Sequence, residues 1–463
     1  MEHFDLIIIG GGSAAFSAAI RANEMKLNTL LINGGLPLGG TCVNVGCLPS
    51  KFLIRAAEQI HKASYSPFEG IIAKGATIDF TKIMQQKKKL VAEMQQKKYL
   101  DLLNDLEFMT IIEGFASFID KNSILINYKE YKAIKIIIAT GSSTLIPGIK
   151  GLENVQYFTN DTLFDLDELP ESLIIIGGGY IGLEIAQAYS RFGSKVSIIE
   201  MADHILSTET KDISDEITHY LNKEGIKIYT GNSVKQVKQV NNLVHVEMDD
   251  QNLVATHLVL ATGRKANTEN LNLENADIAL NNKGFIEVNE KLETNVPNIY
   301  AIGDVNIFPP FVYAAAYEGG IAVANAFEGS EKTVDYSSMP WVIFTDPQVV
   351  GVGIDEQAAQ EENIPFEITS MPLSEVPRSV AALDTRGFIK LIRNPETDLL
   401  LGARIIAPEG SELAMEISLA IKYKVPVKDI IATLHPYLTL SEGIKLAAMS
   451  FTTDLKKMSC CAS

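Results

Sequence analysis

A seven-residue segment occurs twice in this sequence, and it constrains the fold more than any other feature. Leu-Ile-Ile-Ile-Gly-Gly-Gly spans residues 6–12 and again residues 173–179. In both places an apolar run typical of a buried strand enters a glycine turn, and a helical pattern follows. This order opens the βαβ unit that binds dinucleotides, in which the helix N-terminus stabilises the pyrophosphate. Because strand, helix and second strand all recur, the sequence predicts two such units.

The two copies differ at the last position of the glycine fingerprint G-x-G-x-x-G. The first copy has Gly10, Gly12 and Ala15, and the second has Gly177, Gly179 and Gly182. The first glycine permits the tight turn and the second lets the backbone approach the pyrophosphate, whereas the third position sets how closely helix and strand pack. Alanine is compatible with that last role, so both copies are predicted dinucleotide sites.

The residue at the end of the second strand of each unit predicts how the nucleotide ribose is bound. That residue is Asn33 in the first unit and Glu200 in the second. A carboxylate accepts hydrogen bonds from a ribose 2′-hydroxyl and repels a 2′-phosphate, so Glu200 predicts a preference for NADH over NADPH. Use of NADPH with help from a neighbour such as His204 stays an open alternative. Asn33 can also bind a ribose hydroxyl, without the strength of a charged acceptor.

The length and charge of the chain limit its architecture and partners. A chain of 463 residues with 46% hydrophobic residues can bury the cores of about three domains. The net charge of −17 argues against nucleic acid, because cationic side chains must neutralise its phosphates. The basic run at residues 87–89 is interpreted as the solvated face of a helix. With no signal peptide and no apolar stretch of about 20 residues, we expect a cytoplasmic protein with no membrane partner.

The four cysteines form two pairs, and both pairs predict sulfur chemistry. Cys42 and Cys47 stand in GGTCVNVGCLPSK, before a helix expected over residues 50–63, and Cys460 and Cys461 are adjacent near the C-terminus. A helix N-terminus lowers the pKa of a thiol, so we expect a reactive thiolate at neutral pH. The spacing does not suit a plant-type iron–sulfur cluster or structural zinc, and four cysteines are too few for a disulfide framework. A redox-active or metal-capturing thiol pair is left.

Further motifs, taken with these, resemble one known family over the whole chain. They are Ala139-Thr140-Gly141 after a strand and Ile302-Gly303-Asp304 later in the chain. On these motifs the chain resembles the FAD-dependent pyridine nucleotide–disulfide oxidoreductases of class I. The resemblance implies an α/β fold with two Rossmann-like domains, for FAD and NAD(P)H, and a C-terminal α+β dimerisation domain. The implied boundaries are 1–149 with 267–338 for FAD, 150–266 for NAD(P)H, and 339–463 for dimerisation.

The resemblance also implies which residues bind the two cofactors. FAD would be held by Gly10, Gly12, Ala15, Asn33, Gly40, Thr41, Lys51, Ala139, Thr140, Gly141, Gly303 and Asp304. NAD(P)H would be held by Gly177, Gly179, Gly182 and Glu200, with Gly263 and Arg264 at the end of that domain.

The same resemblance implies an electron path. Hydride from the nicotinamide would reach the flavin, which would then reduce a Cys42–Cys47 disulfide. Cys47 would be the thiolate beside the flavin and Cys42 the exchange thiol facing the substrate, because the two roles need different access. Lys51 and Glu184 match the family's ion pair beside the flavin.

The C-terminal domain decides the substrate in this family. Members that reduce organic disulfides end in an HPTxSE segment, whose histidine shuttles protons and is oriented by a glutamate five residues later. Here His435 lies seven residues before Glu442, and the residue five before Glu442 is Tyr437. We therefore expect Tyr437, together with Tyr313, beside the inner cysteines. His435 is expected to be a packed, neutral histidine.

A tyrosine in place of the histidine favours a metal substrate. Thiolates released from a disulfide need protons, whereas reduction of thiolate-bound Hg(II) to Hg(0) needs two electrons and soft ligands. With the terminal pair, these residues are similar to the mercury-reducing branch of the family. The resemblance implies a homodimer with shared active sites, in which Cys460 and Cys461 take Hg(II) from small thiols and pass it to Cys42 and Cys47 of the other subunit.

Two other functions remain open at this stage. The terminal cysteines could pass electrons to a protein disulfide, as in large thioredoxin reductases, although the altered HPTxSE spacing weighs against this. A flavin-bearing protein that only sequesters metal is the non-catalytic alternative. Two expectations depart from the mercury-reducing branch, whose members commonly use NADPH and carry an N-terminal metal-binding domain. Here Glu200 favours NADH, and the first unit begins beside Met1, so we expect no such domain.

Overall fold

The first repeated segment forms a central strand of a seven-stranded sheet. In the computed structural model, which describes residues 2–453, β1 (Glu2–Ile9) pairs in parallel with β2 on one side and β6 on the other. The order is β3-β2-β1-β6-β5-β4, and β17 also pairs with β6. The other strands are β2 (Thr29–Asn33), β3 (Met109–Glu113), β4 (Ala116–Asp120), β5 (Ser123–Ile126), β6 (Lys129–Ile138) and β17 (Ile299–Ala301).

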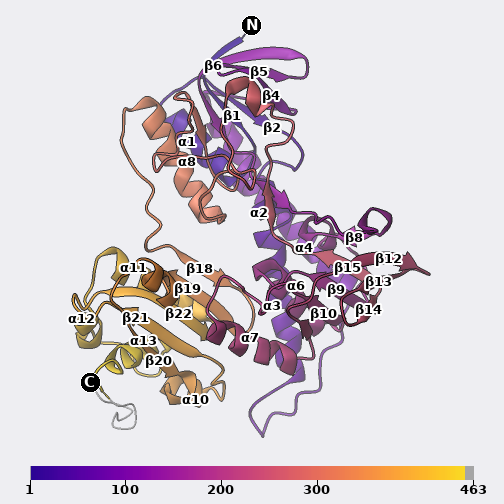
Figure 1. Ribbon diagram of the computed structural model, residues 1–463, viewed down its shortest axis with the longest axis vertical. Coiled ribbons are helices and arrows are strands. Elements are labelled where there is room, and N and C mark those ends of the chain that lie inside the picture. Colours follow the sequence, from indigo (N-terminus) through magenta and orange to yellow (C-terminus); the bar gives the residue numbers. More distant parts are fainter. Residues whose placement is uncertain (1, 454–463) are drawn as a thin grey trace.

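Alternate residues of β1 face two different cores, as expected for a strand buried on both sides. Leu6 and Ile8 pack with the alanine-rich α1 (Ser13–Glu24) and with α8 (Val312–Phe327). Ile7 and Ile9 join the core on the opposite face. The first unit is therefore completed by a helix that follows it in the sequence by almost 300 residues, and Figure 1 shows α1 and α8 side by side.

The second repeated segment forms the centre of a separate, fully parallel sheet. Its order is β11-β10-β9-β15-β8, and α6 (Tyr180–Phe192) follows β9. The chain leaves the first sheet through β7 (Ser142–Thr144) and returns through β16 (Arg264–Ala266), which pair antiparallel. The remaining strands of this region are β8 (Tyr157–Phe158), β9 (Ser172–Ile176), β10 (Lys195–Ile199), β11 (Lys227–Tyr229), β12 (Gln236–Val240), β13 (Leu243–Glu247), β14 (Asn252–Ala255) and β15 (His257–Leu260).

The C-terminal part is built on an antiparallel five-stranded sheet with the order β18-β19-β22-β21-β20. Figure 1 shows it at the lower left, with the first sheet at the top and the second at the lower right. Its strands are β18 (Pro340–Ile343), β19 (Gln348–Gly353), β20 (Glu367–Pro372), β21 (Phe388–Arg393) and β22 (Leu400–Ala407). Its helices are α9 (Glu356–Glu361), α10 (Pro377–Ala381), α11 (Ala414–Lys422), α12 (Val427–Ala432) and α13 (Leu440–Met449).

The predicted fold class, an α/β chain with two dinucleotide-type units and a C-terminal α+β part, is confirmed. The residue boundaries of the three domains stay predictions. The other helices are α2 (Gly40–Asn44), α3 (Cys47–Ser64), α4 (Phe80–Gln95), α5 (Asn160–Leu163) and α7 (Lys211–Lys223). Across residues 2–453, every helix is too short or too polar to cross a bilayer.

Two expectations about helices are wrong in detail. The helix expected over residues 50–63 begins at Cys47 and ends at Ser64, because Pro49 lies in its first turn, where a missing N–H is tolerated. The basic run at residues 87–89 does not lie wholly in solvent. Lys87 is buried with Phe80 and Met84 on one face of α4, and its Nζ donates to the carbonyl of Phe164.

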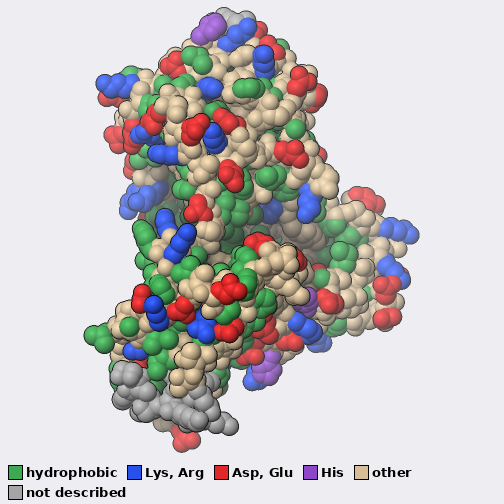
Figure 2. All heavy atoms as spheres, turned by 60° about the vertical axis from the view of Figure 1, so that its left-hand side comes forward, with side chains coloured by type: hydrophobic (Ala, Val, Ile, Leu, Met, Phe, Trp, Pro, Cys, Tyr) green, Lys and Arg blue, Asp and Glu red, His purple; other side chains and the backbone are tan. Residues whose placement is uncertain are grey.

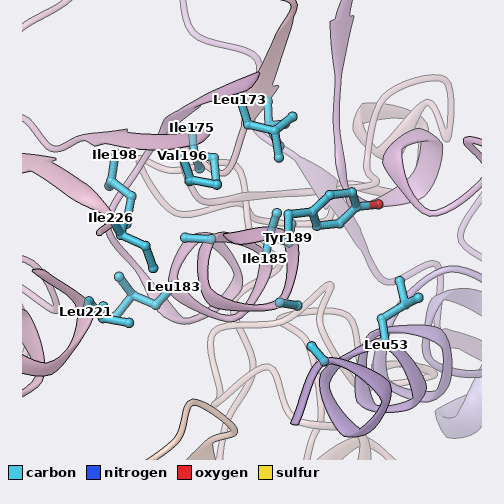
Figure 3. Packing of buried hydrophobic residues seen from close by; sticks show 14 of the residues in the cluster. Leu53, Leu173, Ile175, Leu183, Ile185, Tyr189, Val196, Ile198, Leu221 and Ile226 are labelled. Atoms are coloured by element: carbon cyan, nitrogen blue, oxygen red, sulfur yellow. The ribbon is translucent and has the colours of Figure 1, made fainter. Parts of the chain in front are cut away.

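A single hydrophobic core ties α3 to the second unit. Figure 3 shows Leu53 of α3 on the side of α6 that carries Tyr189, whereas Leu183 of α6 points the other way, toward Leu221 of α7. The same core includes Ile343 and Ile406 of the C-terminal sheet. Packing of this kind fixes α3, and with it Cys47, relative to the nucleotide helix α6.

Candidate active site

Both glycine turns have a geometry that only glycine can adopt without strain. Gly10 has a φ of +133°, and a Cβ there would lie 2.1 Å from the carbonyl oxygen of Ala139. Gly177 has a φ of +112°, and its Cβ would lie 2.2 Å from the carbonyl oxygen of Ala261. The two turns therefore place β1 and β9 in the same way against the next parallel strand.

The helices that follow these turns present open N-termini. Gly12 and Gly179 are the N-cap residues of α1 and α6, and neither helix has a side-chain cap. A Cβ on Gly179 would meet nothing within 4 Å, and one on Gly12 would meet only Cα of Gly40 at 3.9 Å. Uncapped amides with a free approach suit an anionic group. Both units thus fit the pyrophosphate of a dinucleotide.

The third fingerprint position behaves differently in the two units. Ala15 is fully buried in the core beneath α1. At Gly182 the packing is closer, since a Cβ there would lie 2.1 Å from the carbonyl oxygen of Gly177. The predicted tolerance of alanine at this position therefore applies to the first unit.

The two later motifs lie at the edge of the first sheet. Asp304 accepts a hydrogen bond from Ser142 Oγ at 3.0 Å, and the guanidinium of Arg264 donates to Ser142 Oγ and to its carbonyl. The backbone of Gly141 is held by Asn267, whose N–H donates to the Gly141 carbonyl at 2.9 Å. Gly303 and Asp304 are thereby joined to the 139–141 segment where the chain enters and leaves the second unit.

A buried carboxylate that sequence reasoning missed fixes the Gly303–Asp304 turn. Glu318 of α8 is 1% exposed and accepts from the N–H of Gly303 at 2.7 Å, from Asn306 Nδ2 and from the hydroxyl of Tyr336. Burial raises the pKa of this carboxyl. A lone glutamate in the otherwise apolar helix VYAAAYEGGIAVANAF was the available signal.

The inner cysteines form an interacting pair of free thiols. Cys42 lies in α2 and is half-buried, while Cys47 is the first residue of α3 and is exposed. The pKa of Cys47 is lowered to about 7, first by a hydrogen bond from the Cys42 thiol and also by the charge of Lys51. The pKa of Cys42 is raised, mainly because its thiol donates that hydrogen bond and because it is buried. At neutral pH the pair can therefore present Cys47 as the thiolate and Cys42 as the thiol.

An ion pair joins three segments beside these thiols. Lys51 Nζ lies 2.7 Å from Glu184 Oε2, and the second oxygen of Glu184 accepts from the N–H of Phe344 at 2.9 Å. Lys51 also lies 4.7 Å above the Phe344 ring. Because Glu184 is nearly buried whereas the Lys51 side chain is 34% exposed, the ammonium is oriented yet still open to a bound group. The two residues predicted to pair do so.

Replacing Lys51 by methionine is expected to raise the pKa of Cys47 by about one unit. The substitution removes the cation that favours the thiolate and leaves Glu184, whose charge opposes it. Thiolate absorbance of the reduced protein, followed against pH, measures this shift. Lys82→Met is the matched control, because Lys82 is exposed and pairs with Asp79. An unchanged titration in Lys51→Met would mean that Lys51 does not control the thiolate.

The two tyrosines predicted to meet at the thiols do not meet within one chain. Tyr313, at the start of α8, has its pKa raised by burial and by the charge of Cys47, so it lies near that thiolate. Its hydroxyl donates to the carbonyl of Pro340. Tyr437 lies in the loop between α12 and α13, two helices that Figure 1 shows at the lower left, whereas α2 is near the centre.

Two residues other than Glu442 hold His435 in place. Its Nε2 lies 2.8 Å from Glu416 Oε1 of α11, and its Nδ1 lies 3.0 Å from the Thr433 carbonyl. Its side chain is only 5% exposed. Glu442 instead accepts from the N–H of Leu438 at 3.1 Å, at the start of α13. The histidine and this glutamate therefore have separate structural partners.

The residues at the ribose positions are both hydrogen-bonded. Glu200 accepts from the N–H groups of Gly178 at 2.7 Å and Ala202 at 2.8 Å. His204 contacts Asp203 and the Glu209 carbonyl. Asn33 is 4% exposed and donates to the Leu36 carbonyl. Thr41 lies within α2, beside Cys42.

The remaining candidate ligands lie outside the structure. Cys460 and Cys461 fall beyond residue 453, outside the described residues. Within residues 2–453, no group of three or more histidine, cysteine or acidic side chains is arranged to hold a metal ion.

Comparison with known proteins gives consistent matches along the chain. Residues 4–321 match the pyridine nucleotide-disulphide oxidoreductase family, and residues 339–448 match its dimerisation domain. Mercuric reductase from Lysinibacillus sphaericus is 39% identical over 100% of this chain and 85% of its own. Mercuric reductase from Shewanella putrefaciens is 40% identical over 98% and 82%. A solved structure, the Cu(II) complex of the HOCl-induced flavoprotein disulfide reductase RclA from Escherichia coli, superimposes with a TM-score of 0.86, at 30% identity, over 95% of this chain and 98% of that one.

Proposed function

The chain belongs to the pyridine nucleotide-disulphide oxidoreductase family as a flavin-dependent oxidoreductase, and we propose that it reduces thiolate-bound Hg(II) to Hg(0). The observation that carries this choice of substrate is the hydrogen bonding of His435. Both of its ring nitrogens have partners in its own chain, Glu416 and the Thr433 carbonyl. A glutamate partner alone would orient the ring, but here the second nitrogen is also engaged and the side chain is 5% exposed, so neither nitrogen is left to protonate a thiolate. A metal substrate does not require that step. Relatives named mercuric reductase support the same substrate.

The chain's own residues divide the reaction between two units. FAD, when bound, supplies a two-electron carrier between the nicotinamide and the inner thiols. The open helix N-termini at Gly12 and Gly179 hold the pyrophosphates of the two dinucleotides. Glu200 selects NADH, because a 2′-phosphate would meet its carboxylate. Lys51, oriented by Glu184, places a positive charge beside Cys47.

The inner thiols bind the metal by exchange. Hg(II) arrives with two small-molecule thiolates, and each protein thiolate that bonds to mercury displaces one of them. The proton of the Cys42 thiol leaves with a displaced thiolate. Two electrons from one NADH then reduce Hg(II) to Hg(0), and Cys42 and Cys47 are released as thiolates. Tyr313, near Cys47, lines this site.

The active site is completed across a homodimer in this proposal. The dimerisation domain supports a dimer, and α11 exposes Met415 and Leu419, with the exposed Tyr423 directly after its end. Figure 2 shows hydrophobic side chains gathered along a hollow between the upper and lower parts of the molecule. A partner subunit would bring its own loop between α12 and α13, residues 433–439, and with it Tyr437, toward the inner cysteines. Cys460 and Cys461 of that subunit would deliver Hg(II).

Replacing both terminal cysteines by alanine is expected to slow turnover of bulky mercury–thiol complexes by about tenfold while changing small complexes little. A bulky complex reaches the inner thiols poorly, so it depends on delivery by an accessible pair. Steady-state kcat/KM with mercury bound to glutathione and to cysteine measures this. Ser459→Ala, beside the pair, is the control. Equal rates for the double variant with both complexes would remove the tail from the mechanism.

His435→Phe is expected to leave kcat for mercury within about threefold and to lower stability by about 1–3 kcal/mol. The stability loss follows because Glu416 and the Thr433 carbonyl lose their partner. Thermal unfolding and turnover of the same preparation test both halves. A large fall in kcat with unchanged stability would make His435 an acid–base group.

The experiment that tests the function is anaerobic NADH and NADPH oxidation by the flavin-loaded protein with Hg(II) in excess small thiol. Oxidised glutathione, lipoamide and a protein disulfide serve as parallel acceptors. Mercury-dependent oxidation with release of elemental mercury is the expected result, faster with NADH. Oxidation only with a disulfide would overturn the proposal. Failure with every acceptor would favour a flavoprotein that sequesters metal.

A disulfide reductase is the second candidate, because the chain superimposes on a flavoprotein disulfide reductase solved as a Cu(II) complex. In that case the terminal cysteines would carry electrons to a protein disulfide. Adding Cu(II) as a further acceptor in the same assay distinguishes a copper substrate from mercury.

A further inference from the structure

The hydrogen bonds of Asn33 leave it badly placed to bind a ribose hydroxyl by itself. Its Nδ2 donates to the Leu36 carbonyl at 3.2 Å and to both carboxylate oxygens of Glu113, at 3.2 and 3.3 Å. These partners are acceptors only, so they fix which end of the amide is nitrogen. The amide oxygen then faces Gly11, where a Cβ would lie 2.1 Å from it. Asn33 is also 4% exposed.

The two units therefore differ in where they place a carboxylate. In the second unit Glu200, at the end of the second strand, carries it and contacts the glycine turn through the Gly178 N–H. In the first unit the equivalent position is Asn33, and the carboxylate stands one strand further out. Glu113 is the last residue of β3 and is directly paired with Asn33 in the parallel register.

Glu113 has free capacity to accept hydrogen bonds. It is exposed, and within residues 2–453 the donor to its carboxylate is Asn33 Nδ2. A carboxylate has about four acceptor sites, so most of them remain open. Phe115, 76% exposed, lies two residues further on, and its ring edge stands 3.1 Å from where a Cβ on Gly34 would be. An exposed aromatic ring beside an open carboxylate suits a nucleoside, whose base can pack on the ring while its ribose donates to the carboxylate.

We propose that Glu113 accepts the hydrogen bond from the adenosine ribose of FAD in the first unit, and that Asn33 is the positioning residue that aims it. Asn33 holds both carboxylate oxygens and prevents the side chain from swinging into solvent. The negative charge that Glu200 places at the end of the second strand of the second unit is thus supplied in the first unit by Glu113, on the neighbouring strand β3. This inference rests on FAD occupying the first unit and does not depend on the metal substrate.

The test is FAD binding by flavin-free protein, followed by flavin fluorescence. Glu113→Ala is expected to weaken FAD binding about 10- to 100-fold, as for loss of a hydrogen bond to a charged group. The same titration with an FAD analogue that lacks the adenosine 2′-hydroxyl should show a difference of about twofold or less between variant and unsubstituted protein. Asn33→Ala should also weaken binding of FAD more than binding of the analogue without the 2′-hydroxyl, but with a smaller loss of affinity than Glu113→Ala. Glu107→Ala, at an exposed glutamate before β3, is the matched control.

Three outcomes overturn the inference. One is unchanged FAD affinity in Glu113→Ala. Another is an equal loss for FAD and for the deoxy analogue, which would show a general effect on charge or folding. The third is a loss in Glu107→Ala as large as in Glu113→Ala. Thermal unfolding of the flavin-free variants checks their folding, and Glu113→Gln gives the same comparison if the alanine variant is unstable. FAD binding is read without mercury, so failure here leaves the proposed reaction untouched, and failure of mercury turnover leaves this result interpretable.

Discussion

Cys42→Ala is expected to reduce mercury turnover by about a thousandfold or more while NADH still reduces the bound flavin. Cys42 is the exchange thiol in the proposed mechanism, and one remaining thiol cannot hold Hg(II) between two protein sulfurs. The alanine also removes the hydrogen bond that contributes most to the low pKa of Cys47, so that pKa should rise from about 7. Stopped-flow flavin bleaching and steady-state mercury release measure the two half-reactions separately.

Cys42→Ser is the matched control for the two effects of Cys42. A serine hydroxyl can still donate to the Cys47 sulfur, so the pKa of Cys47 should stay closer to its value in the unsubstituted protein, whereas mercury turnover should be lost as in the alanine variant. Turnover close to normal in either variant would contradict the assignment of the inner site. Loss of flavin reduction in both would mean that the thiol supports the flavin site instead.

Gly177→Ala is expected to destabilise the second sheet by about 3 kcal/mol and to abolish NADH-driven flavin reduction. The residue has a φ of +112°, and the new Cβ would stand 2.2 Å from the Ala261 carbonyl oxygen, so β9 and β15 must separate. Hydrogen exchange of the amides in β9 and α6 measures the local stability. Reduction of the flavin by dithionite shows whether the first unit remains intact.

Gly179→Ala separates folding from binding at the same turn. A Cβ there would meet nothing within 4 Å, so hydrogen exchange should be nearly unchanged. Nicotinamide binding should still fall, because the methyl group stands where the pyrophosphate approaches the open start of α6. Normal NADH binding in Gly179→Ala would show that the nucleotide does not use this helix N-terminus.

Much of the fold follows from local patterns. The apolar runs, the glycine turns and the helical periodicity were enough to predict both dinucleotide-type units, because each signal lies within about 30 residues. Local signals were weaker at boundaries. The helix expected to begin at residue 50 begins at Cys47, since a proline such as Pro49 is tolerated in the first turn of a helix. The prediction that the basic run lies in solvent was wrong for Lys87, which is on a buried face of α4. Periodicity alone does not show which neighbouring segment covers a helix.

The candidate site was harder to predict from the sequence where a residue's hydrogen-bond partner lies far away in the chain. Counting residues between His435 and Glu442 correctly separated the two, but it gave no sign that Glu416 holds the histidine. Glu318 gave only the weak signal of a lone glutamate in an apolar helix, and Glu113 belonged to no motif. Their hydrogen-bond partners lie in turns and neighbouring strands that meet only after folding.

The sequence by itself determined the two glycine turns and the two pairs of cysteines, and the family resemblance implied the pairing of Lys51 with Glu184, because each depends on residue types at fixed positions. The resemblance implied that Cys47 is the thiolate, but only the tertiary structure showed why its pKa is low and which carboxylate meets which partner. Those properties depend on hydrogen bonds and distances between segments up to hundreds of residues apart. The pKa of Cys47 illustrates this, since it reflects a thiol in α2 and a cation in α3 that is itself oriented from α6. Folding sets such distances through packing of the shared core, and residue spacing does not encode them.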